Sequence, residues 1–204
     1  MPAFPNESPH YRAARNRLLQ SELELRRKMG AVAAELRALL DGGEAPEDYL
    51  FERIGQGGDV EQVRLSALFG KSDTLMVYHM MFPRDSRDGR NGPLDGAFAK
   101  VPLADGPCPS CTALLDMWDG TMPHFEGLGG NLVIVAKVAV AQLSAFANEK
   151  DWKNIRLLSA AGNSFRRDYG AESPAGEPVP IMTVFKRDPD GTLRFHWASE
   201  PIFE

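Results

Sequence analysis

Apolar side chains recur at helical spacing along the first forty residues. Ser8 followed by Pro9 is typical of a helix start, because serine caps the first turn and proline suits the first helical position. The apolar residues continue at near-heptad intervals until Gly42 and Gly43, at Leu18, Leu25, Met29, Val32, Leu36 and Leu39. This pattern predicts a long helix over residues 8–41. We expect it either to lie on the rest of the chain or to pair with a second copy in a homodimer.

Beyond residue 43 the pattern changes to short runs separated by turns. Two continuous apolar runs, 74–82 and 131–138, are typical of central strands buried on both faces. Helix-like segments lie at 112–119, 140–150 and 163–169, and shorter strand-like segments at 49–54, 62–65, 156–159, 180–187 and 192–197. Strand–helix alternation predicts parallel pairing, and the turn at 188–191 predicts a final antiparallel hairpin. The chain is therefore expected to form an α/β fold with a mixed sheet.

A polar stretch, 83–107, follows the first apolar run. Loops of this length are usually functional or mobile. Its apolar residues need to be buried somewhere, and they are Leu94, Phe98, Val101 and Leu103. We expect either a lid over the residues that follow or a spacer tolerated at a modest entropic cost.

Composition excludes several classes of function. With 204 residues and 43% hydrophobic content the chain can build a full core. A net charge of −5 gives no basic patch, so we expect no nucleic-acid partner. No apolar run is long enough to span a membrane, and the first residues lack the basic-then-apolar order of a signal peptide. We therefore expect a cytoplasmic protein without a membrane partner.

The two cysteines of the chain stand three residues apart, as Cys108-Pro109-Ser110-Cys111, where a helix is expected to begin. Residues three apart on a helix have Cβ atoms about 5–6 Å apart, so a small adjustment lets such a pair form a disulfide. The positive end of a helix also favours a thiolate over a thiol. The motif predicts a reversible dithiol, half of a cysteine–histidine metal site, or an inert pair.

The four histidines are scattered and lack the regular spacing of a zinc site. We therefore expect no metal. The alternative, a copper or zinc carrier, would need a third ligand beside the cysteines from His79, His124 or His196. His79 is either a core residue or a base or ligand near the cysteines, and His124 is a surface or capping residue unless it serves as that ligand.

A CxxC helix after a buried strand, with a late proline before a hairpin, resembles the thioredoxin-like fold. The match extends to YHMMF (78–82), CPSCTALLDMWDG with PHF (108–125), NLVIVAKV (131–138), WKNIRLLSAAGNSFRRDYG (152–170) and VFKRDPDGTLRFHWASE (185–200). Together these segments resemble the bacterial thioredoxin-like family catalogued as domain of unknown function 899. The resemblance implies an α/β/α sandwich over 44–204 with an inserted loop at 83–107, preceded by a tail and long helix in 1–43.

The resemblance also implies roles for individual residues. In the thioredoxin-like pattern the first cysteine attacks and the second resolves, so Cys108 would be the nucleophile and Cys111 the resolving thiol. Pro109 suits an early helical position, and Ser110 either donates to sulfur or is solvated. Thioredoxins place a cis proline beside the dithiol, and Pro180 occupies that place here.

Other residues near the motif have structural explanations as well. Pro178 is the alternative to Pro180 as the cis proline. We expect Trp118 to be a core residue and Asp119 to be a cap or, alternatively, a proton relay. Arg166 and Arg167 are expected on a solvated helix face.

We therefore expect a thiol–disulfide oxidoreductase that needs no cofactor. Its partners would be a protein or small-molecule disulfide as substrate and an external thiol as electron donor. The alternatives are a thiol peroxidase-like reductase, the copper or zinc carrier, and a scaffold that assembles through its N-terminal helix. Against the peroxidase, the sequence shows no Thr-x-x-Cys element with an arginine placed to polarise a peroxide.

Overall fold

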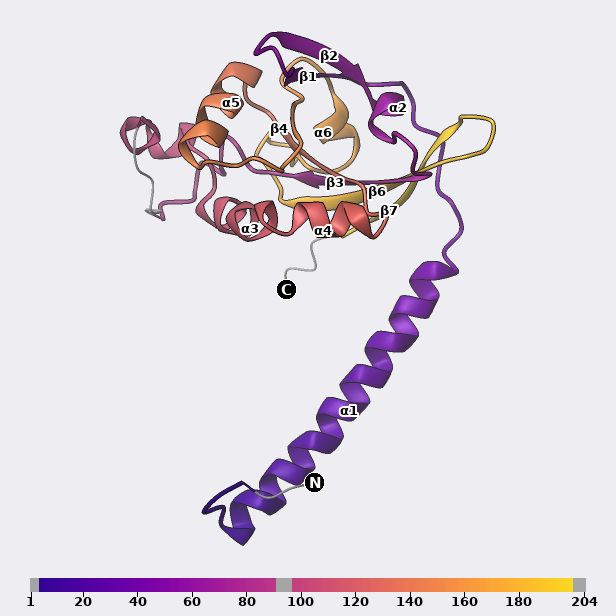
Figure 1. The fold of residues 1–204 in the computed structure, drawn as a ribbon, viewed down its shortest axis with the longest axis vertical. Coiled ribbons are helices and arrows are strands. Elements are labelled where there is room, and N and C mark those ends of the chain that lie inside the picture. Colours follow the sequence, from indigo (N-terminus) through magenta and orange to yellow (C-terminus); the bar gives the residue numbers. More distant parts are fainter. Residues whose placement is uncertain (1–3, 91–96, 200–204) are drawn as a thin grey trace. The chain divides into compact units, whose positions relative to one another are not determined.

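The computed structural model describes residues 4–90 and 97–199 and divides into two units, Met1–Leu40 and Asp41–Glu204 (Figure 1). Helix α1 (Pro9–Arg37) fills most of the first unit. Its predicted cap is confirmed, because the Ser8 hydroxyl accepts a hydrogen bond from the backbone N–H of Tyr11 at 3.1 Å. The helix ends before Gly42, and none of its residues is buried. Pairing with a second copy stays a prediction.

The second unit is built on a seven-stranded sheet with the order β2-β1-β5-β4-β3-β6-β7. Its strands are β1 (Leu50–Ile54), β2 (Val60–Arg64), β3 (Thr74–His79), β4 (Leu132–Ala136), β5 (Leu157–Ser159), β6 (Ile181–Arg187) and β7 (Leu193–Ala198). Its helices are α2 (Leu65–Leu68), α3 (Pro109–Asp119), α4 (Met122–Gly127), α5 (Val140–Glu149) and α6 (Phe165–Asp168). Strands β3, β4 and β5 are parallel, whereas β6–β7 and β1–β2 are antiparallel pairs. The predicted mixed sheet is confirmed.

Alternation along β3 divides the core between the two faces of the sheet. Leu75 and Val77 contribute to a core that includes α2 and α6, and Tyr78 and Met80 contribute to a core that includes α3, α4 and α5. Figure 1 shows α3 and α4 along one side of β3 and α6 on the other. The helices therefore cover both faces, which confirms the predicted α/β/α sandwich.

Two segments differ from the sequence-based expectation. Strand β3 ends at His79, although its apolar run continues to Phe82. Beyond His79 the N–H of Met80 still donates to Val135 at 2.9 Å, but the carbonyl of Met80 accepts from Arg166 at 2.8 Å and the carbonyl of Met81 accepts from the N–H of Cys108 at 2.9 Å. Helix α4, which begins beside a proline, was not predicted. None of the described helices is long and apolar enough to cross a membrane.

Candidate active site at the cysteine pair

Both cysteines lie at the start of α3, beyond the carboxyl end of β3. Cys108 is the N-cap residue of α3, and Cys111 lies in its first turn. Both side chains are buried, and neither forms a disulfide. The bond from the Cys108 N–H to Met81 fixes the helix start against the segment that leaves β3. The pair thus occupies the edge at which parallel sheets usually carry their functional sites.

The two thiols differ strongly in acidity. The pKa of Cys108 is lowered to about 6, although burial opposes this shift. The main cause is a hydrogen bond from the Cys111 thiol, and smaller contributions come from the backbone N–H groups of Cys111 and Ser110 and from the charge of Arg90. The Cys108 thiolate and burial in turn raise the pKa of Cys111 far above its usual range. Cys108 therefore ionises first, and Cys111 keeps its proton.

Arg90, from the loop after β3, reaches the cysteine pair. Its Nη2 lies 3.8 Å from the Sγ of Cys108, and its Nη1 donates to the hydroxyl of Ser110 at 2.8 Å. The hydroxyl of Ser110 is thus an acceptor for Arg90. Asp88 accepts from Nε and Nη2 of Arg90 at 2.8 and 2.6 Å, and this pairing lowers the pKa of Asp88 to about 2. The guanidinium is therefore held beside the sulfur while its side chain stays 58% exposed.

Tyr78 contacts the second sulfur from β3. Its hydroxyl donates to the Sγ of Cys111 at 3.2 Å, and both side chains are buried. The ring of Trp118 from α3 packs edge-on against the Tyr78 ring, with centroids 5.3 Å apart. Trp118 is half-buried in this core, as expected. Burial and the neighbouring Cys111 raise the pKa of Tyr78, so its hydroxyl remains a donor.

Arg166 is buried, contrary to the expectation of a solvated helix face. Its Nη1 donates to the carbonyls of Met80 and Val135 at 2.8 and 3.1 Å, and its Nη2 donates to Ala171 at 3.2 Å. Burial lowers its pKa to about 10, while the charge of Glu172 and those of Cys111 and Tyr78 act in the opposite direction. Arg166 therefore places a buried cation near the carboxyl edge of the sheet. The neighbouring Arg167 is exposed, as expected.

The structure does not bring the predicted histidines to the cysteines. His79 is buried on the opposite face of β3, where it stacks on Phe165 at 5.3 Å and its Nε2 lies 3.0 Å from the Thr183 hydroxyl. Successive strand residues face opposite sides, so His79 points away when Tyr78 points toward Cys111. His124 is exposed on α4. Among the described residues no three histidine, cysteine or acidic side chains could hold a metal together, so the carrier hypothesis has no third ligand there.

The expectation for the cis proline is corrected, and for Asp119 the structure favours the cap over the alternative of a proton relay. The cis proline bond found in the described part of the chain precedes Pro83, and the bonds before Pro178 and Pro180 are not cis. Asp119 is not placed as a proton relay, because its carboxylate caps a distant loop. Its Oδ1 accepts from three consecutive backbone N–H groups at 2.9, 2.8 and 3.2 Å, those of Lys153, Asn154 and Ile155.

The inserted loop packs partly into the core around the cysteines. Phe98 is buried against Phe82 and Phe146, with ring centroids 5.8 and 4.9 Å apart. Val101 packs against the same core, but Leu103 is exposed. Leu94 lies outside the described residues. The lid interpretation stays a prediction.

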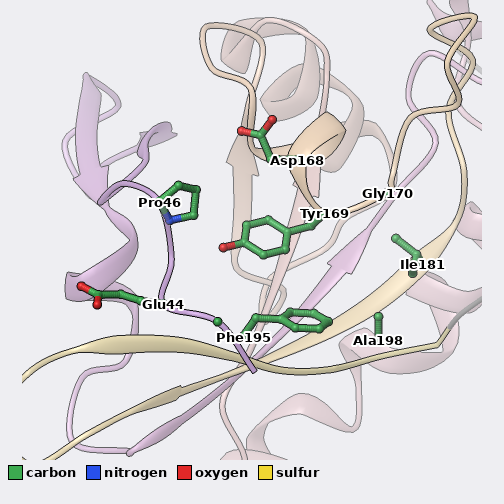
Figure 2. A pocket seen from close by; sticks show the side chains of 9 residues that line it. Glu44, Pro46, Asp168, Tyr169, Gly170, Ile181, Phe195 and Ala198 are labelled. Carbon is green, nitrogen blue, oxygen red and sulfur yellow. The ribbon is translucent and has the colours of Figure 1, made fainter. Parts of the chain in front are cut away.

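A cavity of about 500 Å³ lies between the segment after residue 41, the end of α6 and the terminal hairpin (Figure 2). The rings of Tyr169 and Phe195 form part of its wall, with Ile181 and Ala198 beside them. Neither cysteine lines it, nor does Tyr78 or any arginine of the candidate site. It is therefore a separate hollow, and the cysteine pair itself is covered by side chains.

Comparisons with known proteins place the chain in a family and a fold. The model of the family described as "Bacterial protein of unknown function (DUF899)" matches residues 1–201. No curated protein matches the chain. Among solved structures, AhpC of Enterococcus faecalis is 13% identical, with 80% of this chain and 81% of that chain covered and a TM-score of 0.51. Reduced 2-Cys peroxiredoxin of Plasmodium vivax is 18% identical, with 79% and 72% covered and a TM-score of 0.50. These likenesses show a thioredoxin-like fold.

Proposed function

Given that the chain belongs to the bacterial family DUF899, whose function is unknown, we propose that it is a thiol–disulfide oxidoreductase that uses Cys108 and Cys111. One observation carries this proposal. Cys108 caps the start of α3 with the guanidinium of Arg90 3.8 Å from its sulfur, and Cys111 lies in the first turn of the same helix. This arrangement lowers the pKa of Cys108 to about 6, whereas the pKa of Cys111 is raised and Cys111 keeps its proton. At neutral pH the first sulfur is therefore mostly a thiolate, which is the form that attacks a disulfide.

Only the two sulfurs of the chain and the substrate form and break covalent bonds in this reaction. The Cys108 thiolate attacks one sulfur of a substrate disulfide, so that a mixed disulfide forms and the other substrate sulfur leaves as a thiolate that takes up a proton. Cys111 then loses its proton and attacks the Sγ of Cys108. This step forms the Cys108–Cys111 disulfide and releases the second substrate sulfur as a thiol. The substrate gains two electrons, and the dithiol loses them.

An external thiol must return the two electrons for another turnover. We propose that the protein works in the cytoplasm, where such thiol donors keep disulfides reduced. Its substrate would be a protein or small-molecule disulfide. No cofactor enters any of these steps.

Alkylation followed by mass measurement tests the proposal. After mild oxidation of the native protein both thiols should be blocked, and after reduction both should react. In Cys111→Ser the mixed disulfide should persist, so a trapped substrate can be identified by its mass. If both thiols remain free under every oxidising condition, the proposal fails.

Arg90 favours a second candidate function, peroxide reduction. A guanidinium 3.8 Å from the Cys108 sulfur can bind the oxygen atoms of a small peroxide, and the sequence had given no sign of such an arginine. The Cys108 thiolate would attack one oxygen and break the O–O bond, which gives a sulfenate and an alcohol or water. After the sulfenate takes up a proton from solvent, the Cys111 thiol would attack its sulfur, form the disulfide and release water. Treating Cys111→Ser with peroxide and trapping sulfenic acid separates this activity from disulfide exchange, in which no sulfenic acid forms.

A further inference from the structure

We infer that Tyr78 is a catalytic residue for the second step, in which it stabilises the thiolate that Cys111 must become. This inference rests on the proposed thiol–disulfide exchange. Its basis is the 3.2 Å hydrogen bond from the Tyr78 hydroxyl to the Sγ of Cys111, within a core where both side chains are buried. A hydrogen bond to a charged acceptor is stronger than one to a neutral acceptor, so this contact gains strength as Cys111 ionises.

The resolving step requires a group that stabilises the Cys111 thiolate, because the Cys111 thiol does not ionise readily. In the reduced protein the charge of Cys108 and burial both oppose its ionisation. Once Cys108 is bonded to a substrate sulfur it carries no charge, and the burial of Cys111 remains as the main obstacle. Tyr78 supplies the largest opposing effect, followed by a backbone hydrogen bond at Met81.

Among the described residues no aspartate or glutamate forms a hydrogen bond with Cys111 or Tyr78. None of the groups that shift the pKa of Cys111 or Tyr78 is an aspartate or glutamate, and the carboxylate of Asp119 is engaged with the loop after α5. Arg166 adds a buried positive charge that interacts with both Cys111 and Tyr78. The hydrogen bond from Tyr78 and the positive charge of Arg166 therefore stabilise the Cys111 thiolate without a general base beside it.

The proton balance follows from the acidity of Tyr78. Its own pKa is raised, so its hydroxyl keeps its proton and donates it only as a hydrogen bond. The Cys111 proton goes to water and from there to the departing substrate thiolate. Tyr78 is thus unchanged at the end of the step.

The role of Tyr78 can be tested by measuring the two steps in which the full-length reduced protein releases thiolates from an aromatic disulfide. Dithiobis(nitrobenzoic acid) releases one coloured thiolate when Cys108 attacks and a second when Cys111 resolves the mixed disulfide. In Tyr78→Phe we expect the first phase to change less than twofold and the second to slow at least about tenfold. The midpoint of the second phase should also move to higher pH. Tyr49→Phe is the matched control, because it removes a buried hydroxyl that bonds Asp168 at 2.9 Å, away from the cysteines, and should leave both phases unchanged.

The possible outcomes distinguish the role of Tyr78 from the proposed function. An unchanged second phase and pH midpoint in Tyr78→Phe overturn the role of Tyr78, while a two-phase parent still supports the exchange reaction. A parent that never releases the second thiolate overturns the proposed function instead. If Tyr78→Phe does not fold, fluorotyrosine at position 78 replaces it as the variant. Its more acidic hydroxyl should speed the second phase, and an unchanged or slower phase counts against the role.

Discussion

Removing the Cys111 thiol should make Cys108 a weaker acid. That thiol is the largest of the groups that lower the pKa of Cys108 to about 6. A hydrogen bond to a charged group contributes about 1.5–3 kcal/mol, and about 1.36 kcal/mol corresponds to one pKa unit. In Cys111→Ala the pKa of Cys108 should therefore rise to about 7–8. At pH 6 the thiolate fraction, and with it the rate of attack, should fall roughly 5- to 50-fold.

The assay is the rate of alkylation by iodoacetamide as a function of pH. Reactivity of Cys108 should increase as pH rises through its pKa, because only the thiolate reacts. Cys111→Ser is the matched control, since its hydroxyl can still donate to the sulfur, and its midpoint should lie below that of Cys111→Ala. A midpoint that stays near 6 in Cys111→Ala would refute the reasoning. The backbone N–H groups and Arg90 would then account for the acidity.

Three further predictions concern residues away from the two sulfurs. Arg166→Met removes three hydrogen bonds from a buried cation to backbone carbonyls, each of which keeps a backbone N–H donor, and should lower the free energy of unfolding in urea by about 3 kcal/mol; Arg167→Met, at an exposed site, should stay within about 0.5 kcal/mol. Burial and then Arg166 hold the pKa of His79 well below 6.5, so its contribution to stability is complete above that pH and is lost as pH falls. His79→Gln should flatten this acid-side loss, and an unchanged slope would contradict the assignment. Leu25→Glu combined with Met29→Glu places charges in the exposed stripe of α1 and should dissociate a homodimer in sedimentation; a monomeric parent would exclude the dimer.

The fold was largely predictable because it depends on local patterns. The apolar run that contains β3, the turn at 188–191 and the Ser8 cap each act within a few residues. The turn and the cap lie where the sequence placed them, and β3 begins as predicted but ends three residues earlier. The CxxC spacing is equally local, and Cys108 and Cys111 do begin a helix. Such features need no knowledge of how distant segments pack.

The surroundings of the cysteines could not be predicted in the same way. Tyr78 is 33 residues from Cys111, Arg90 is 18 residues from Cys108, and Arg166 is 86 residues from Met80. Strand alternation shows that Tyr78 and His79 face opposite sides, but only the packing of α3 decides which side holds the cysteines. Four-residue α6 is likewise too short for its periodicity to distinguish a buried arginine from an exposed one.

Helix α3 is anchored at both ends, by the Cys108 N–H at its start and by Asp119 at its end. Oxidation therefore has little freedom to move the helix, and the backbone of the two redox forms should be nearly the same. What changes is charge, since a disulfide removes the thiolate beside Arg90. The guanidinium keeps its charge, but the electrostatic potential around it becomes more positive because the neighbouring negative charge is lost. A binding partner could thus tell the oxidised protein from the reduced one by electrostatic attraction alone, with affinity for acidic surfaces rising on oxidation and weakening in salt.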